Sequence, residues 1–478
     1  MTFGHYGVKR SINELDSIFS CQWSNGMLPH IRFASLRTSE RPYRPDAEDW
    51  GVSPAISGGT STPTSGITQP PIVGRCVWQV FHRLDSTAQL CYHDQFCNMA
   101  LALQRYHDWL FRERDPHCEN LVACIHPWET GMDNSPAFAP LLESVHSYLG
   151  AIGSSLLPLD FRRADTTHVN AKHRPTGRDY FAYLGLLRLF RSHQYNGDAA
   201  LSTTPFLLQD VLFNSTLCAS ILALASLQEA LAQNSQNGET GPALRELAAS
   251  NRIRADQVAR SIRDKLWDDS TGYFYDFDLK SNRLLDIPTV ASFAPLLSGI
   301  ASPAQEARLE SHLFVPEGFG SPVPVPSMPL LHPRFDPVRY WSGPVWPVTN
   351  WLIFEGLRER GSPAAEQIRR STLQVIAEGV PLDDAAKLAM EVMEANSVGR
   401  NGEEYTTPST SQYSHAWLWD SAIAAISWPY IDEKPARTEL DAPKPGFWEY
   451  YHAVTGAPLG AKHMTWTASL FLDMLRNP

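Results

Sequence analysis

The chain has 478 residues, of which 43% are hydrophobic and 19% charged, a composition that is typical of globular proteins and excludes a disordered chain. Its formal net charge of −11 argues against nucleic acid and anionic membranes as partners, because both bind basic surfaces. The sequence shows no apolar stretch near the ~18–20 residues that span a bilayer and no apolar signal region at its start, so we expect a cytoplasmic protein without a membrane partner.

Apolar residues recur along the whole chain at the 3.6-residue spacing of amphipathic helices. The segments with this pattern are 12–23, 99–114, 180–193, 210–233, 243–267, 348–360, 366–380, 383–397 and 465–477. Alternating strand patterns are scarce, so the expected fold class is all-α. About a dozen long helices with polar connectors favour a ring of helical hairpins over a short bundle.

Three stretches rich in proline and polar residues are predicted to be loops, namely 38–69, 321–347 and 430–445. The second stretch holds eight prolines, each of which lacks the backbone N–H that a helix interior uses. The third stretch is polar and is expected to be a linker.

The number of cysteines is odd, and no C-x-x-C pair occurs. A disulfide framework is therefore disfavoured, and we expect buried, reduced thiols in a reducing compartment. The seven residues are Cys21, Cys76, Cys91, Cys97, Cys118, Cys124 and Cys218.

Common catalytic signatures are missing from the sequence. It contains no GxxxxGK[ST], HExxH or GxSxG, no GxGxxG after a strand, and its sixteen histidines lack the spacing of metal ligands. These absences argue against nucleotide-dependent, zinc-protease and serine-hydrolase chemistry.

Carboxylates stand close to tryptophan or tyrosine in several separate segments. Asp133 follows Trp128 in a loop bounded by proline and glycine, where desolvation would raise the pKa of the acid and suit it to donate a proton. Asp420 follows Tyr413 and Trp417 at the start of an apolar helix. Each aspartate also has a plainer interpretation as the residue that caps the following helix.

Aromatic side chains gather at Tyr340, Trp341 and Trp346, next to glycine and proline. Such a rigid loop suits stacking on sugar faces, although core packing uses the same residues. Glu449 precedes a glycine-rich turn and an apolar helix, where an ordinary surface position is the alternative. Together the segments favour two carboxylates in an aromatic groove. Glycoside hydrolysis requires this pair, one to protonate the leaving oxygen and one to activate water or attack.

Six longer blocks resemble glycoside hydrolase family 63, most of all its short mannosylglycerate and glucosylglycerate hydrolases. The blocks span nearly the whole chain and read WSNGMLPHIRF, TSGITQPP, ETGMDNSP, PFLLQDVLFN, YWSGPVWPVTNWLIFEGL and EYYHAVTGAPLGAKHMTWTASL. The resemblance implies that residues 1–478 form a single catalytic domain with the (α/α)6 barrel fold. It also implies an inverting mechanism without a cofactor or a metal.

The resemblance assigns roles residue by residue. It makes Asp133 in GMDNSP the general acid and Glu449 in EYYHAVTG the general base. Tyr413, Trp417 and Asp420 match a Y-x3-W-x2-D block whose aspartate holds sugar hydroxyls. The implied wall of the sugar site comprises Gln69, Trp128, Tyr340, Trp341, Gly343 and Trp346. The residues implied at the carboxylate of a glycerate acceptor are Tyr43 and Arg174, with Tyr180 nearby.

The segment 382–428 departs from the order of the family. Its block YTTPS…WLWDSA normally lies near the N-terminus, whereas here it stands between YWSGPVWP and EYYHAVTG. A closed ring places its first and last helices side by side, so the segment could still occupy its usual place. We predict that it packs beside the C-terminal helix and brings Asp420 into the pocket of Asp133. A gene-model error or an inactive enzyme would explain the order equally well.

The predicted function is an inverting glycosidase that releases a hexose, glucose or mannose, from an acidic glycosylglycerate. Its only expected partner is this small carbohydrate. The carboxyl groups of Asp133 and Glu449 should then lie about 6.5–9.5 Å apart in one pocket. The alternatives are a related α-glucosidase for a neutral glucoside and an inactive sugar-binding paralogue.

Overall fold

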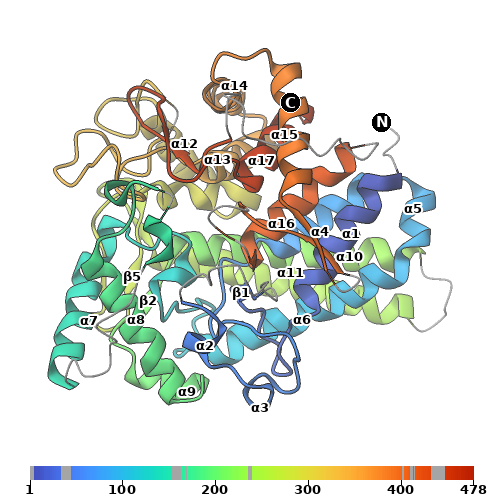
Figure 1. The fold of residues 1–478 in the computed structure, drawn as a ribbon, viewed down its shortest axis with the longest axis horizontal. Coiled ribbons are helices and arrows are strands. Elements are labelled where there is room, and N and C mark those ends of the chain that lie inside the picture. Colours follow the sequence, from blue (N-terminus) through green and yellow to red (C-terminus); the bar gives the residue numbers. More distant parts are fainter. Residues whose placement is uncertain are drawn as a thin grey trace.

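A computed structural model gives the fold of the chain (Figure 1). It describes residues 5–33, 45–152, 163–167, 169–234, 240–323, 325–400, 403–409, 413, 415–431 and 447–477.

Six helical elements among the described residues form a closed inner ring. Each element packs against the next one, and the last packs against the first. In ring order they are α4 (Val73–Arg83), α10 (Val211–Asn234), η6 (Val290–Gly299), α13 (Pro347–Glu359), α17 (Thr465–Arg476) and α16 (Leu418–Ser427). Most residues of α10, α13 and α16 are buried. This is expected for helices that are surrounded by neighbouring elements.

A second set of helices covers the inner ring. Its members are amphipathic and pack with one face on one or two inner elements. They are α1 (His5–Phe19), α6 (His93–Arg114), α11 (Thr240–Lys265), α12 (Pro303–Leu313), α14 (Ala364–Ala377) and α15 (Leu382–Ala395). The two layers together are an (α/α)6 barrel, which confirms the predicted all-α class.

Shorter elements extend the barrel at its ends. The helices are α2 (Ala47–Trp50), α3 (Pro54–Ser57), α5 (Ser86–Cys91), α7 (Ala139–Ile152), α8 (Gly177–Ser192) and α9 (Gly197–Thr203). The strands form antiparallel sheets of two or three members: β1 (Ile31–Arg32) with β9 (Ala416–Trp417); β10 (Tyr450–Tyr451) with β11 (Pro458–Leu459); β3 (Trp267–Asp268) with β4 (Tyr273–Phe274); β7 (Ser397–Arg400) with β8 (Glu403–Thr406); and β2 (Leu208–Gln209), β5 (Phe277–Asp278) and β6 (Arg283–Leu284) in the order β2–β5–β6.

Local signals set the boundaries of the helices that carry site residues. The Thr176 hydroxyl accepts the Asp179 N–H while the Asp179 carboxylate accepts the Thr176 N–H, and this capping box starts α8. Pro347 is the first residue of α13, a position where its missing N–H has no cost. Capping side chains also start α2 and α3 inside 38–69, so the prediction of one continuous loop there was wrong; residues 38–44 lie outside the described part.

The segment 382–428, which was predicted to pack beside the C-terminal helix, completes the ring. Helix α16 packs against α1, α4 and α17, and Figure 1 shows it beside the N-terminal helices. Strand β9 pairs with β1, and the Leu418 N–H donates to the His30 carbonyl oxygen at 3.1 Å. The segment therefore lies beside the C-terminal helix, as predicted. Residues 432–445 of the expected linker lie outside the described residues.

Helix α10 is a longer apolar stretch than the sequence analysis expected to find in the chain. It has 24 residues, and its most apolar window has a mean hydropathy of 1.6, so by length and composition it could cross a membrane. In the fold 89% of that window is buried, because α4, α6, α11 and η6 surround the helix. The apolar run serves the core of the barrel.

The cysteines are only partly as predicted. All seven are free thiols, and Cys21, Cys76, Cys124 and Cys218 are buried. Cys91 and Cys118 are exposed, so the expectation that every thiol is buried was wrong. Cys91 is the last residue of α5, and Cys118 lies in the turn that follows α6, so both side chains are open to solvent.

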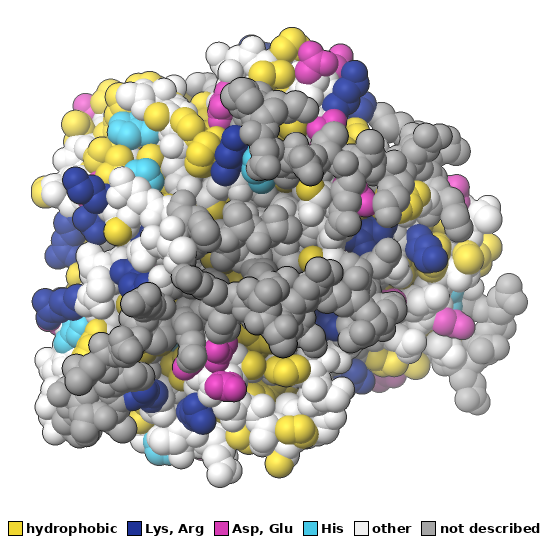
Figure 2. Space-filling model, viewed as in Figure 1, with side chains coloured by type: hydrophobic (Ala, Val, Ile, Leu, Met, Phe, Trp, Pro, Cys, Tyr) yellow, Lys and Arg dark blue, Asp and Glu magenta, His cyan; other side chains and the backbone are white. Residues whose placement is uncertain are grey.

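Basic side chains do not gather on the visible face of the molecule. Figure 2 shows Lys and Arg scattered among other side chains over the described surface. Several are paired with acids, as Arg252 is with Glu229 at 2.6 Å.

Close packing of α1 on the 3₁₀ turn η7 (Trp428–Tyr430), which follows α16, gives a testable consequence. A Cβ at Gly7 would overlap the carbonyl oxygen of Trp428 and lie 2.6 Å from that of Ile431. We expect Gly7→Ala to lower the free energy of unfolding by about 1–3 kcal/mol, because the helices must move apart. Denaturant unfolding measures the change.

Gly150 in α7 provides the control. A Cβ there meets nothing within 4 Å, so Gly150→Ala should stabilise the helix by about 0.4–1 kcal/mol. Equal stability of Gly7→Ala and the parent chain would contradict tight packing at the ring closure.

Candidate active site

One cavity at the end of the barrel contains nearly all the residues predicted for the site. Segments that are far apart in sequence meet there, including the loop before α7, the start of α16 and the hairpin of β10 and β11. The predicted residues that line it are Gln69, Trp128, Asp133, Arg174, Tyr180, Tyr340, Trp341, Trp346, Tyr413, Trp417, Asp420 and Glu449.

Two predicted residues are not part of this wall. Tyr43 lies outside the described residues. Gly343 is buried behind the wall, where its N–H donates to Ser327 Oγ at 2.8 Å and a Cβ would overlap the carbonyl oxygen of Asp336. Gly343 therefore allows the close approach of two loop segments and does not face the cavity.

Asp133 projects into the cavity from a tight turn. The 3₁₀ turn η1 (Pro127–Thr130) ends at Gly131, whose φ of 76° is unfavourable for other residues. The side chain of Asp133 caps no helix, since the next turn starts after Ser135. Removal from bulk water raises the pKa of Asp133 to about 7; Arg174 opposes the shift and Glu449 adds to it. A carboxyl group of this kind can deliver a proton near neutral pH.

Glu449 is held by hydrogen-bond donors on several sides. Its side chain is 2% exposed, which excludes the surface position considered for it. Arg174 Nη1 donates to both carboxylate oxygens at 2.9 and 2.8 Å, and the Tyr413 hydroxyl donates at 3.0 Å. The Ala461 N–H donates at 2.9 Å after Gly460, where a Cβ would lie 2.7 Å from Glu449 Oε2. These donors stabilise the charged carboxylate and fix its direction.

Arg174 is buried and contacts groups on every edge of its guanidinium. Besides Glu449, it binds the Tyr413 hydroxyl through Nη2 and Asp165 Oδ2 through Nε at 3.4 Å. Its guanidinium carbon lies 4.4 Å from the centre of the Tyr340 ring. The structure thus places Arg174 in the cavity but pairs it with the two carboxylates of the protein.

Asp420 is a third carboxyl group in the cavity. It is the third residue of α16, whose cap position is Trp417, so the capping interpretation was wrong. Burial raises the pKa of Asp420 to about 8, and the nearby charge of Glu449 adds to the shift. The backbone next to it is fixed because the Trp419 N–H donates to Gln69 Oε1 at 3.1 Å.

The aromatic wall is a layered stack. Trp341 and Trp346 lie parallel with ring centres 3.9 Å apart, and Trp346 stacks on Tyr450 at 4.4 Å. The Trp341 N–H donates to Asn134 Oδ1 at 3.1 Å, so this wall is attached to the loop of Asp133. The arrangement gives a rigid apolar surface with polar edges, as sugar rings require.

Sequence reasoning missed several residues of the wall. Trp466 lines the cavity and stands inside a block quoted for the resemblance, so its tryptophan was an available signal. Trp419 also lines it; the sequence marks Trp419 beside Asp420 at the start of the apolar helix but gives it no role. His30 also lines it, and burial lowers the pKa of His30 to about 3, which keeps the ring neutral. The other missed residues are Ile31, Pro45, Gly131, Pro408 and Met464.

The cavity does not have the composition of a metal centre. Among the described residues, no cluster of three or more His, Cys, Asp and Glu is arranged to hold a metal ion. The groups that converge are carboxyl groups, one guanidinium and aromatic rings, which suit acid–base chemistry on a sugar.

Known proteins resemble this chain over most of its length. Residues 1–414 match the family model of the mannosylglycerate hydrolase MGH1-like glycoside hydrolase domain. Mannosylglycerate hydrolase of Rubrobacter radiotolerans is 36% identical over 383 residues, which cover 79% of this chain and 80% of that protein. Glucosylglycerate hydrolase of Mycolicibacterium hassiacum is 27% identical over 479 residues, with coverages of 98% and 87%.

A solved structure shares the fold. It is the GH63 mannosylglycerate hydrolase from Thermus thermophilus in complex with Tris and D-glycerate. The TM-score is 0.68 at 27% identity, and the match covers 98% of this chain and 92% of the other.

Burial of Asp420 predicts how stability depends on pH. Because the folded chain keeps a proton that the unfolded chain loses between its ordinary pKa of 3.8 and about 8, folding becomes less favourable as pH rises through this range. Asp420→Asn carries no such titration. We expect its stability relative to the parent chain to increase with pH by up to about 1.4 kcal/mol per pH unit.

Denaturant unfolding at pH 5 and pH 8 measures this difference. The same difference at both values would show that Asp420 ionises in the folded state as it does in the unfolded chain.

Proposed function

Because the chain belongs to the mannosylglycerate hydrolase MGH1-like family of glycoside hydrolases, within glycoside hydrolase family 63, we propose that it is an inverting enzyme that releases glucose or mannose from an acidic glycosylglycerate. The observation that carries the proposal is the meeting of Asp133, Glu449 and Arg174 in one aromatic cavity. The first can supply a proton, the second can accept one, and the third is a cation within reach of an acidic aglycone.

Asp133 acts as the general acid in this proposal. Its raised pKa keeps a proton on the carboxyl group up to neutral pH, so the group can protonate the glycosidic oxygen as the bond breaks. Glu449 acts as the general base on a water molecule at the opposite face of the sugar. Inversion requires room for that water, and the carboxyl groups should lie about 6.5–9.5 Å apart in the working complex.

Asp420 and the aromatic wall hold the sugar. A protonated Asp420 can both donate to and accept from sugar hydroxyls, and Gln69 lies next to it through the Trp419 N–H. Trp341, which is stacked on Trp346, can offer its other face as a flat apolar surface for the ring.

Arg174 and Tyr413 form the acceptor end of the site. A planar guanidinium suits a carboxylate, and Tyr413 and Tyr180 lie in the same wall. The relatives are named for mannosylglycerate and glucosylglycerate, and the solved neighbour was determined with D-glycerate. These names support a glycerate aglycone for this chain.

One observation favours a second candidate, the hydrolysis of a neutral α-glucoside. Arg174 is already bound to the carboxylates of Glu449 and Asp165, so its charge is compensated within the protein. An uncharged aglycone could then bind without competing for the guanidinium.

Hydrolysis assays with the purified full-length chain distinguish the candidates. The substrates are the 2-O-α-glucoside and 2-O-α-mannoside of glycerate and, as the neutral comparison, glucosylglycerol. Proton NMR of the first product shows its anomeric form. We expect a β-hexose from the acidic glycosides. An α-hexose would contradict inversion, cleavage of glucosylglycerol alone would favour the second candidate, and no cleavage would contradict both.

The pKa of Asp133 predicts the alkaline limb of the pH profile. Since the acid must carry its proton, kcat/KM should fall above about pH 7, approaching tenfold per pH unit. Asp133→Asn should lower kcat by roughly 10²–10⁴-fold on glycosylglycerates.

A glycoside with a nitrophenyl leaving group serves as the control, because its departure needs little protonation. Asp133→Asn should retain far more activity on it. Equal losses on both substrates would show that Asp133 does not protonate the leaving oxygen.

Arg174 should affect both kinetic constants. Arg174→Lys keeps a charge but loses the paired contacts to Glu449 and Tyr413, so kcat should fall on acidic and neutral glycosides alike. The KM should rise only for the acidic substrate, by about ten- to a hundredfold for one charge-assisted bond. Steady-state kinetics on both substrates measures this, and equal KM changes would contradict a role in binding the acceptor.

A further inference from the structure

A second arginine lies directly behind the acceptor end of the cavity. Arg163 donates through Nε to Asp165 Oδ1 at 3.0 Å and through Nη2 to Asp165 Oδ2 at 2.6 Å. The same Asp165 oxygen accepts from Arg174 Nε at 3.4 Å. Asp165 is fully buried, so a single carboxylate bridges two guanidinium groups in a weakly screened environment.

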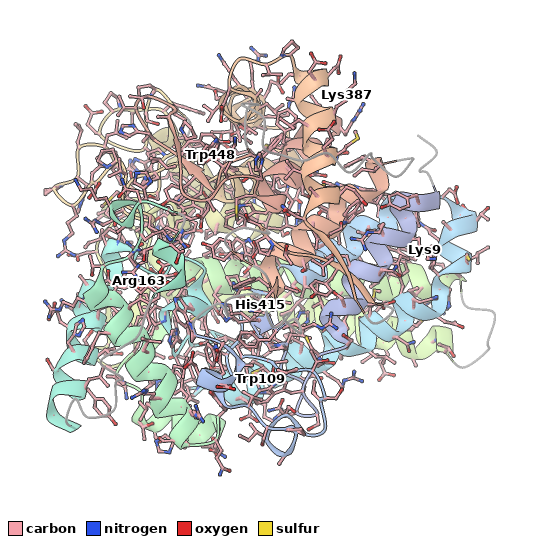
Figure 3. All side chains as sticks on the ribbon, in the orientation of Figure 1. Lys9, Trp109, Arg163, Lys387, His415 and Trp448 are labelled. Carbon is pink, nitrogen blue, oxygen red and sulfur yellow. The ribbon has the colours of Figure 1, made fainter. Side chains whose placement is uncertain are left out.

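Arg163 itself is not among the lining residues, but a lining residue separates it from the cavity. Its guanidinium carbon lies 3.9 Å from the centre of the Tyr180 ring, and Tyr180 faces the cavity. Figure 3 shows Arg163 by the helices α7 and α8. The positive charge of Arg163 thus lies against a ring that lines the cavity.

The charges around the acceptor end are balanced. Arg163 and Arg174 carry two positive charges, while Asp165 and Glu449 carry two negative ones. Without Arg163, the single guanidinium of Arg174 would serve both protein carboxylates, and the group as a whole would be negative. Such a site would repel an acceptor carboxylate and leave Arg174 less able to bind it.

We propose that Arg163 is a positioning residue that makes the site selective for an acidic aglycone, by neutralising the shared carboxylate of Asp165 so that the group around Arg174 does not carry a net negative charge. The inference rests on the proposed function, because it requires an acidic glycoside as substrate. Its effect is on acceptor binding and not on bond cleavage.

Steady-state kinetics of Arg163→Gln tests the proposal on a glycosylglycerate and on a neutral glucoside. We expect KM for the acidic substrate to rise about five- to twentyfold, the effect of one partly screened charge nearby. The kcat on the acidic substrate and both constants on the neutral one should change less than about twofold. Arg163→Lys restores the charge and should recover most of the lost affinity.

Arg178→Gln is the matched control. The variant loses the same charge as Arg163→Gln, but Arg178 forms an exposed ion pair with Glu143, with both side chains 63% exposed. This variant should have the kinetics of the parent chain. If it raised KM as much as Arg163→Gln, the effect would be one of overall charge, and the proposal would be overturned.

The interpretation of the remaining outcomes depends on whether the Arg163 variants fold. If Arg163→Gln does not fold, Arg163→Met, whose unbranched side chain can still pack on Tyr180, carries the same prediction. A folded variant with unchanged KM, or with equal losses on both substrates, overturns the role of Arg163. Failure of the parent chain to cleave any glycosylglycerate would instead overturn the proposed function.

Discussion

The packing of α16 between α4 and α17 is the contact on which the rest of the barrel depends. Arg83 of α4 donates to the Ile426 carbonyl oxygen at 2.8 Å and pairs with Asp473 of α17 at 2.7 Å, so one side chain joins all three helices. Between α16 and α17, Ser469 Oγ donates to the Ile423 carbonyl oxygen at 2.7 Å. Buried polar groups of this kind are costly to leave unpaired, and they therefore fix the register of the closing helix as well as its position.

The closed ring creates an end cavity in which carboxyl groups have different environments. Burial raises the pKa of Asp133 to about 7 and that of Asp420 to about 8, whereas Glu449 receives donors from Arg174, Tyr413 and the backbone. Three negative charges would repel one another in so small a space. Because burial favours the protonated form of two of the acids, the guanidinium can serve the third, and the environments of the acids differ in the way that a proton donor and a proton acceptor require.

Much of this arrangement could be predicted from the sequence, and the exceptions have physical reasons. Long amphipathic helices such as α11 could be predicted from the 3.6-residue spacing of their apolar residues. The element η6 contains Pro295 and has non-helical backbone angles at Leu297 and Ser298, so its sequence does not show this spacing. Asp133 and Glu449 drew attention because each acid stands near tryptophan or tyrosine, and the structure places both in the cavity, but their roles came only from the resemblance. The bridge from Arg163 through Asp165 to Arg174 could not be found, because its partners come together only in space and carry no common motif.

The order of segments along the chain matters less than their adjacency in the ring. Tyr413 contacts Glu449 and Asp420 lines the same cavity, although both precede Glu449 in the chain and belong to a different segment. The pairing of β1 with β9 joins that segment to residues near the N-terminus, and α16 closes the ring against α4. Since the geometry of a site depends on where side chains lie and not on the path of the chain between them, closure of the ring also assembles the cavity.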